Sequence, residues 1–324
     1  GDVGSGKTVI ALYAVICAFE NGHQSAFMAP TELLASQHFN TAKILLENLG
    51  IRIVLLTGHM KKKEKISVLE KIENHEADLI IGTHAIIQDD VKFKKLALCI
   101  TDEQHRFGVQ QRSDFSAKSQ LPHLLVMSAT PIPRTLALIL YGDLDISSVK
   151  ELPRNRKRVL TYSVDESFRT RIHNFIKKIV SKNEQVFVVC PSIYENEVLD
   201  ITNVTTKFNQ MQNSMPDLSI LMLHGQMKNV EKNEILEKFI KNEISVLVTT
   251  SIIEVGIDIP NATLMIIEDA QQFGLSQLHQ LRGRVGRSDK QSYCILINQS
   301  DSVISKKRME VMVNSNDGFY ISEQ

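Results

Sequence analysis

The first eight residues hold the clearest chemical pattern in the chain. Gly1-Asp2-Val3-Gly4-Ser5-Gly6-Lys7-Thr8 matches GxxxxGK[ST], in which glycines let backbone N–H groups surround phosphate oxygens. In this pattern Lys7 reaches the β- and γ-phosphates of a nucleoside triphosphate, and the Thr8 hydroxyl is a ligand of Mg²⁺. The amphipathic stretch 7–20 follows directly and predicts a helix whose N-terminus faces the same anion. We therefore expect all eight residues to bind ATP, with Thr8 also in the Mg²⁺ shell.

An acidic pair ends an apolar run further along the chain. Residues 96–101 lead straight into Asp102 and Glu103. Nucleotides bind beyond the carboxyl ends of parallel strands, which is where this pair falls if the run is a strand. We expect Asp102 to hold Mg²⁺ and Glu103 to orient or deprotonate the attacking water.

A basic cluster lies near the other end, in the sequence QLRGRVGR over residues 280–287. Arg284 and Arg287 are three residues apart, so on a short helix they share a face. We expect them to reach the γ-phosphate as arginine fingers, with Gln280 among the nucleotide-binding residues. Upstream, Asp258 is expected to accept a hydrogen bond from the ribose or to orient an arginine.

The elements that must position these residues alternate between short apolar runs and longer amphipathic ones. Most apolar runs are β-branched or leucine-rich, as in strands buried on both faces of a parallel sheet. The predicted strands are 25–30, 51–57, 77–82, 96–102, 124–130, 185–191, 219–224, 245–250, 263–268 and 292–297. This alternation predicts an α/β doubly wound fold. It pauses at the polar, proline-containing stretch 152–157, so we place a domain boundary near residue 155.

The composition of the chain limits the kinds of binding site and the cellular location that we expect. The chain has 324 residues with 37 Lys+Arg and 37 Asp+Glu, so nucleic-acid binding requires local patches rather than a global basic field. The four cysteines are far apart and each lies in an apolar run, which predicts buried thiols and no zinc site. No apolar run approaches the ~18 residues of a membrane span, and no signal peptide is recognisable, so a cytoplasmic protein is expected. Because the chain starts inside a motif, we expect a fragment that lacks the strand before the phosphate loop.

The order of these motifs resembles that of superfamily 2 helicases, whose two RecA-like lobes clamp ATP between them. The phosphate loop is followed by DEQH at 102–105, SAT at 128–130, TT at 249–250 with GIDIP at 256–260, and the arginine cluster. Three strings look like the bacterial RecG branch: DEQHRFGVQ at 102–110, MSATPIPRTL at 127–136 and FGLSQLHQLRGR at 273–284. In the related transcription-repair translocase Mfd the acidic motif usually reads DEEQRFG, and DEAD-box RNA helicases fit poorly.

The resemblance implies an ATP-dependent helicase or translocase on double-stranded DNA. It would act as a monomeric motor in the bacterial cytoplasm and remodel branched DNA, such as stalled replication forks and recombination intermediates, in DNA repair and recombination. The lobes would be residues 1–155 and 156–300, with 301–324 starting a truncated translocation hairpin. DNA-backbone contacts would come from Thr31, Thr57, Gly58, Thr83, His84, Arg106, Phe107, His224, Gly225 and Thr250. An Mfd-like motor and a nucleotide-binding module inactivated by truncation stay open as alternatives, and the fork-reading wedge domain of RecG proteins is not in this sequence.

Overall fold

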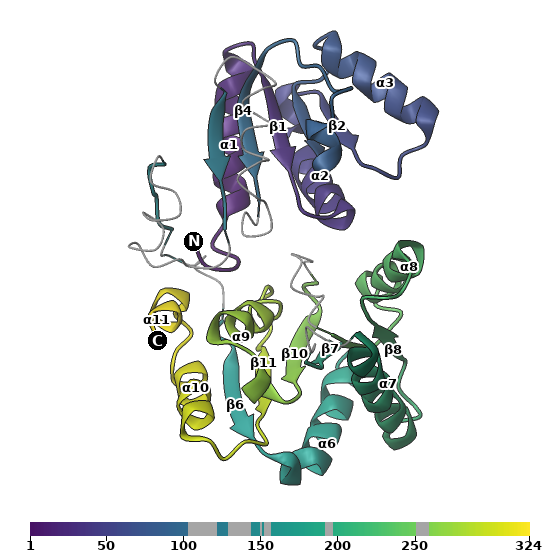
Figure 1. The fold of residues 1–324 in the computed structure, drawn as a ribbon, viewed down its shortest axis with the longest axis vertical. Helices are drawn as coiled ribbons and strands as arrows, with labels where there is room; N and C mark the ends of the chain where they lie inside the picture. Colours follow the sequence, from purple (N-terminus) through teal and green to yellow (C-terminus); the bar gives the residue numbers. More distant parts are fainter. Residues whose placement is uncertain (103–121, 129–143, 150, 152–156, 192–196, 251–258) are drawn as a thin grey trace. The chain divides into compact units, whose positions relative to one another are not determined.

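The computed structural model describes residues 1–102, 122–128, 144–149, 151, 157–191, 197–250 and 259–324 (Figure 1). The chain folds into two compact units. Gly1 and Ser5–Ala129 form the first unit, and Asp2–Gly4 and Thr130–Gln324 form the second. The boundary expected near residue 155 lies outside the described residues and stays a prediction.

The first unit is built on a five-stranded parallel sheet (Figure 1). The strand order is β2 (Ile53–Leu56), β3 (Leu79–Gly82), β1 (Gln24–Met28), β4 (Leu96–Thr101) and β5 (His123–Val126). The helices described in this unit are α1 (Lys7–Glu20), α2 (Glu32–Leu46) and α3 (Lys62–Glu73), with the short 3₁₀ helices η1 (Glu47–Leu49) and η2 (His84–Ile87). β1 and β3 are buried along their whole length, as expected for inner strands covered on both faces.

The second unit is built on a six-stranded sheet, and every neighbouring pair in it is parallel. The order is β6 (Leu160–Val164), β11 (Tyr293–Ile297), β10 (Ala262–Ile267), β7 (Gln185–Val189), β9 (Val246–Thr249) and β8 (Ile220–Leu223). Within its described residues the helices are α6 (Arg169–Val180), α7 (Glu197–Ser214), α8 (Asn229–Ile240), α9 (Leu275–Arg282), α10 (Val303–Asn314) and α11 (Gly318–Glu323), with η4 (Glu166–Phe168) and η6 (Ala270–Gln272). Two parallel α/β sheets confirm the predicted fold class. No helix within the described ranges has the length and apolar character to cross a membrane.

β6 is the strand that the sequence pattern missed. It lies at the edge of its sheet and is mostly uncovered: Thr161 is buried, whereas Leu160, Tyr162 and Ser163 are exposed. An edge strand of this kind lacks the continuous apolar run by which the other strands were recognised.

The cysteines correct one expectation. Cys99, Cys190 and Cys294 are buried, and burial raises the pKa of each thiol to about 12. Cys17 is exposed, because it lies on a part of α1 that the sheet does not cover. The prediction of a buried thiol was therefore wrong at this position, where an apolar sequence neighbourhood did not mean an inward-facing side chain.

A buried glutamine is the first residue of the central strand of the first sheet, β1, and bonds it to neighbouring segments of the chain. Gln24 is fully buried, and its Nε2 donates to the carbonyl oxygens of Ile72 and Ala77, each at 2.9 Å. Its Oε1 accepts from the backbone N–H groups of Lys94 at 2.9 Å and Lys95 at 3.0 Å. One side chain thus satisfies four backbone groups that come from three segments of the chain.

Gln185 has the corresponding place at the start of β7 in the second sheet. Its Nε2 donates to the carbonyl oxygens of Phe239 at 2.6 Å and Ile244 at 2.8 Å. Its Oε1 has no hydrogen-bond partner among the described residues. The two glutamines therefore offer a matched pair that differs in the number of bonds each makes.

We expect Gln24→Leu to lower the free energy of unfolding by about 2 kcal/mol or more, because the two buried carbonyl groups of Ile72 and Ala77 lose their donor at about 1–3 kcal/mol each before relaxation, and the partly buried N–H groups of Lys94 and Lys95 lose their acceptor. Gln185→Leu breaks only two bonds and should cost less. Hydrogen exchange followed by mass spectrometry tests the location of the effect: the amides of Lys94 and Lys95 should lose protection in Gln24→Leu and keep it in Gln185→Leu. Equal losses in the two variants would contradict this account.

Candidate functional site: an ATP site at the carboxyl edge of the first sheet

The phosphate-loop pattern adopts a conformation suited to anions. Gly4 and Gly6 have positive φ values of 71° and 88°, and Gly6 is the N-cap of α1. Nothing lies within 4 Å of the position of a Cβ on Gly6, so its backbone angle rather than space requires glycine. Such turns aim successive N–H groups into one concavity, at a helix N-terminus whose first N–H groups have no intrahelical partner. The Lys7 ammonium donates to the carbonyl oxygen of Gly1 at 2.9 Å.

The donor groups of the loop fit a phosphate. The hydroxyl of Ser5 is buried and has no hydrogen-bond partner among the described residues. A buried polar atom without a partner is uncommon and calls for an explanation, which a phosphate oxygen supplies. Lys7 and Thr8 are half-buried and close to this hydroxyl in sequence. With Asp102 they form a donor and ligand set that suits a nucleoside triphosphate with Mg²⁺.

The expected site residues of the first unit follow its parallel strands at one edge. Thr31 follows β1, Thr57 follows β2, Thr83 follows β3 and Asp102 follows β4. Backbone bonds tie these exits together: the N–H of Asp102 donates to the Met28 carbonyl at 3.0 Å, and that of Thr83 to the Leu56 carbonyl at 3.3 Å. The fold thus brings the expected Mg²⁺ ligand and the expected DNA contacts to the same edge.

Two segments expected to contact DNA lie against one another in this unit. Thr31 caps α2 by accepting a hydrogen bond from Leu34 N at 3.4 Å. The next residue, Glu32, accepts from the backbone N–H of His59 at 3.1 Å and lies 2.9 Å from its Nδ1. This pair joins the start of α2 to the turn after β2, which holds Thr57 and Gly58. Thr57 is buried, whereas Gly58 and, on η2, His84 are exposed.

The second unit repeats the arrangement at the carboxyl ends of β8 and β9. His224 follows β8 and Thr250 follows β9, and the two strands are paired in parallel. Burial, helped by the charge of Lys232, holds the pKa of His224 below its usual value. The Lys232 ammonium donates to the carbonyl oxygen of Gly225, and Thr250 is buried. The fold therefore brings together these three expected contacts.

The arginine cluster occupies α9 and the turn that follows it. Gln280 and Arg284 are buried, and Arg287 is half-buried with its Nε donating to the carbonyl oxygen of Gly283 at 3.3 Å. The nucleotide contacts expected of these three residues stay predictions. Glu103, Arg106, Phe107 and Asp258 lie outside the described residues.

Arg282, which the sequence analysis did not single out, is an anchor inside the second unit. It is 2% exposed and donates to the carbonyl oxygens of Met312 at 2.7 Å and Ser315 at 2.8 Å. It also lies 3.0 Å from Nδ1 of His279 and donates to the Thr161 hydroxyl at 3.3 Å. It thus ties α9 to the end of α10. Nothing in the QLRGRVGR pattern distinguishes this arginine from the other two.

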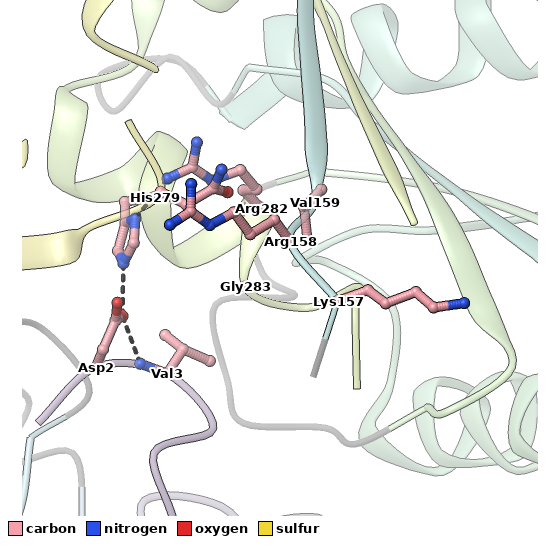
Figure 2. A pocket seen from close by; sticks show the side chains of 9 residues that line it. Asp2, Val3, Lys157, Arg158, Val159, His279, Arg282 and Gly283 are labelled. Carbon is pink, nitrogen blue, oxygen red and sulfur yellow. Dashed lines mark hydrogen bonds and ion pairs between the residues drawn. The ribbon is translucent and has the colours of Figure 1, made fainter. Parts of the chain in front are cut away.

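Residues Asp2–Gly4 pack within the second unit, where Asp2 is held by α9 (Figure 2). An Asp2 carboxylate oxygen lies 2.6 Å from His279 Nε2 and accepts from Val3 N at 2.6 Å, and the other accepts from Gly318 N at 3.3 Å. Because an arginine only donates, Arg282 requires His279 to accept at Nδ1, so Nε2 carries the proton that Asp2 receives. Burial raises the pKa of Asp2, but the hydrogen bond from His279, together with those from the backbone N–H groups of Val3 and Gly318, outweighs burial and holds it below its usual value.

These side chains border a small pocket of about 50 Å³ (Figure 2). Its lining residues are Asp2, Val3, Lys157, Arg158, Val159, His279, Arg282, Gly283 and Asn316. In the wall of this pocket Gly283 packs closely against Val3, because a Cβ added to Gly283 would lie 2.8 Å from the Cβ of Val3.

Comparison with known proteins places these features in a family. Residues 1–139 match the family model of the DEAD/DEAH box helicases, and residues 170–289 match that of the helicase conserved C-terminal domain. The ATP-dependent DNA helicase RecG of Bacillus subtilis (strain 168) is 45% identical over 325 residues, which cover all of this chain and 48% of that protein. RecG of Aquifex aeolicus (strain VF5) is 47% identical over 330 residues, covering 42% of its length. The chain spans about half the length of the curated relatives it matches.

Solved structures agree with this result. A RecG structure bound to a three-way DNA junction superposes with a TM-score of 0.85 at 39% identity, covering all of this chain and 42% of that one. Dbp5 of S. cerevisiae, bound to RNA and ADP BeF3, superposes with a TM-score of 0.72 at 16% identity, over 97% of this chain and 82% of that one. The second likeness shows the fold alone.

We expect Gly283→Ala to lower the free energy of unfolding by about 1–3 kcal/mol, because the new methyl group overlaps Val3 and the packing must shift. Since Val3 belongs to the phosphate loop, the affinity for a fluorescent ATP analogue should fall as well. Gly274→Ala is the matched control: both glycines have ordinary φ values, and the nearest atom to a Cβ at Gly274 is Gln277 Oε1 at 3.8 Å. The prediction is wrong if the two variants bind the analogue equally well.

Proposed function

We propose, since the chain belongs to the RecG family of helicases, that it hydrolyses ATP to move on double-stranded DNA and to remodel branched DNA. Stalled replication forks and recombination intermediates are the substrates of this class. The observation that carries the proposal is the carboxyl edge of the first sheet, where Asp102 and the hydroxyl-bearing turns after β1, β2 and β3 lie together. The relative solved on a three-way DNA junction supports branched DNA as the substrate.

The residues of the proposed ATP site would have different roles, according to the chemistry of their side chains. The loop N–H groups and Lys7 would bind the phosphates, and the charge of Lys7 would stabilise the phosphoryl group as it is transferred. The Thr8 hydroxyl and the Asp102 carboxylate would hold Mg²⁺, which neutralises phosphate charge. Glu103, directly after Asp102, would orient or deprotonate the attacking water, and Arg284 and Arg287 would act on the γ-phosphate.

The DNA contacts would be to the backbone and independent of sequence. Hydroxyl groups and exposed backbone N–H groups suit phosphate oxygens and carry no base information. Such groups follow the strands at the carboxyl edge in both units, as Thr31, Thr83 and Thr250 do. A chain with no net charge needs local contacts of this kind to hold a polyanion.

The remaining assignments belong to the same proposal. We assign residues 1–155 to the ATP-binding lobe, 156–300 to the second lobe and 301–324 to the start of a translocation hairpin. The match to the first family model ends at residue 139 and the match to the second begins at residue 170, so the proposed boundary at residue 155 lies between them. The helices α10 and α11 lie in the last segment. The protein would work as a monomer in the bacterial cytoplasm. The curated relatives described above are RecG helicases, which favours this interpretation over an Mfd-like motor or an inactive nucleotide-binding module.

We expect Lys7→Ala to lower ATP turnover by about 100-fold or more, because it removes a charge that stabilises the transferring phosphoryl group. The melting temperature should not change, since Lys7 is half-buried and its ammonium bonds the Gly1 carbonyl within the loop itself. Steady-state hydrolysis in the natural full-length protein is the measurement, with the exposed Lys71 changed to alanine as the control. Turnover by Lys7→Ala within about twofold of wild type would contradict the ATP site.

A further inference from the structure

A histidine of α2 contacts the carboxylate that is expected to hold Mg²⁺. His38 Nε2 lies 3.0 Å from Oδ2 of Asp102, although the two residues are 64 positions apart in the sequence. His38 is on the helix that follows β1, and Asp102 is at the end of β4, the neighbour of β1 in the sheet. The contact therefore joins two segments that the parallel sheet places side by side.

The direction of the hydrogen bond follows from the chemistry of the two groups. An ionised carboxylate only accepts, so His38 must donate through Nε2–H. A hydrogen bond to a charged acceptor is shorter and about twice as strong as one between neutral groups. Both side chains are shielded from water, with exposed fractions of 10% for His38 and 14% for Asp102, so little solvent competes for the bond.

The surroundings leave His38 little freedom to move. Its ring packs on that of Phe27, with the ring centroids 4.5 Å apart and the planes at 31°. Phe27 is fully buried in β1, and the next residue of the strand, Met28, accepts the backbone N–H of Asp102 at 3.0 Å. The backbone of Asp102 is therefore bonded to β1, and its side chain is bonded to α2.

The opposite edge of the same sheet offers a comparison. Asp78, just before β3, is buried and accepts two bonds from the Arg52 guanidinium, at 2.9 Å and 2.7 Å. Burial raises the pKa of Asp78, but these bonds outweigh burial and hold it below its usual value. That pair lies at the amino ends of the strands, where parallel sheets do not bind ligands. Asp102 lies at the binding edge, so its partner bears on the site as well as on stability.

We propose that His38 is a positioning residue for Asp102, fixing the carboxylate in the orientation that binds the metal ion of the ATP site. The inference rests on the proposed function, which gives Asp102 its role. Carboxylates that bind metals are commonly held by a further hydrogen bond, and losing that partner typically costs about 10–100-fold in metal affinity or activity.

The test is a Mn²⁺ titration of the natural full-length protein with a non-hydrolysable ATP analogue, followed by electron paramagnetic resonance. His38→Leu keeps an apolar contact with Phe27 and removes the donor, and the Mn²⁺ dissociation constant should rise about 10-fold or more. His38→Gln should restore most of the affinity, because its amide nitrogen reaches the position of Nε2. Arg52→Met is the matched control: it removes the guanidinium bonds to Asp78, should lower the melting temperature and should leave Mn²⁺ affinity unchanged.

Two results would overturn the proposal. One is a His38→Leu variant with wild-type Mn²⁺ affinity. The other is an equal loss of affinity in His38→Leu and Arg52→Met, which would mean that lost stability alone explains the effect. Failure of the proposed function looks different, because Asp102→Asn would then bind Mn²⁺ and the analogue as wild type does, whatever the His38 variants do.

Discussion

The parallel arrangement of the two sheets is the constraint on which the rest of the structure depends. Every paired strand within the described residues runs in the same direction as its neighbour, so all the strands of a sheet end at one edge. Each strand must then return through a crossover connection, usually a helix, and the residue after each strand lies on that edge. In the first unit Thr57, Thr83 and Asp102 directly follow β2, β3 and β4, and Thr31 lies three residues after β1, so separated segments of this unit form one polar rim.

A polar rim on an apolar sheet is useful only if its side chains are held in place. The first unit does this with contacts between strand exits: Glu32 bonds His59, and His38 bonds Asp102. Both Glu32 and His38 belong to α2, so one helix contacts the turn expected at the DNA and the acid expected at Mg²⁺. The helix is anchored at its start by the Thr31 cap and along its length by buried residues such as Leu34 and Leu46.

Sequence reasoning predicted most of what local pattern determines. Buried parallel strands read as apolar runs, and the phosphate loop and the Asp102 position follow from spacing and the preceding strand. The pattern failed for β6, whose edge position leaves Tyr162 half exposed, and for Cys17, which lies in an apolar stretch but faces outwards. It also missed His38 and the pair of Asp2 with His279, because those partners are 64 and 277 residues apart and neither contact has a sequence signature. The tertiary fold alone brings them together.

ATP hydrolysis by the natural full-length protein, measured with and without a three-way DNA junction at fixed salt, tests the central claim most directly. We expect slow hydrolysis without DNA, strong stimulation by the junction, weaker stimulation by single strands, and no dependence on the base sequence of the arms. A rate of hydrolysis that does not change when DNA is added, or that rises equally with RNA and with branched duplex DNA, would contradict the proposed function.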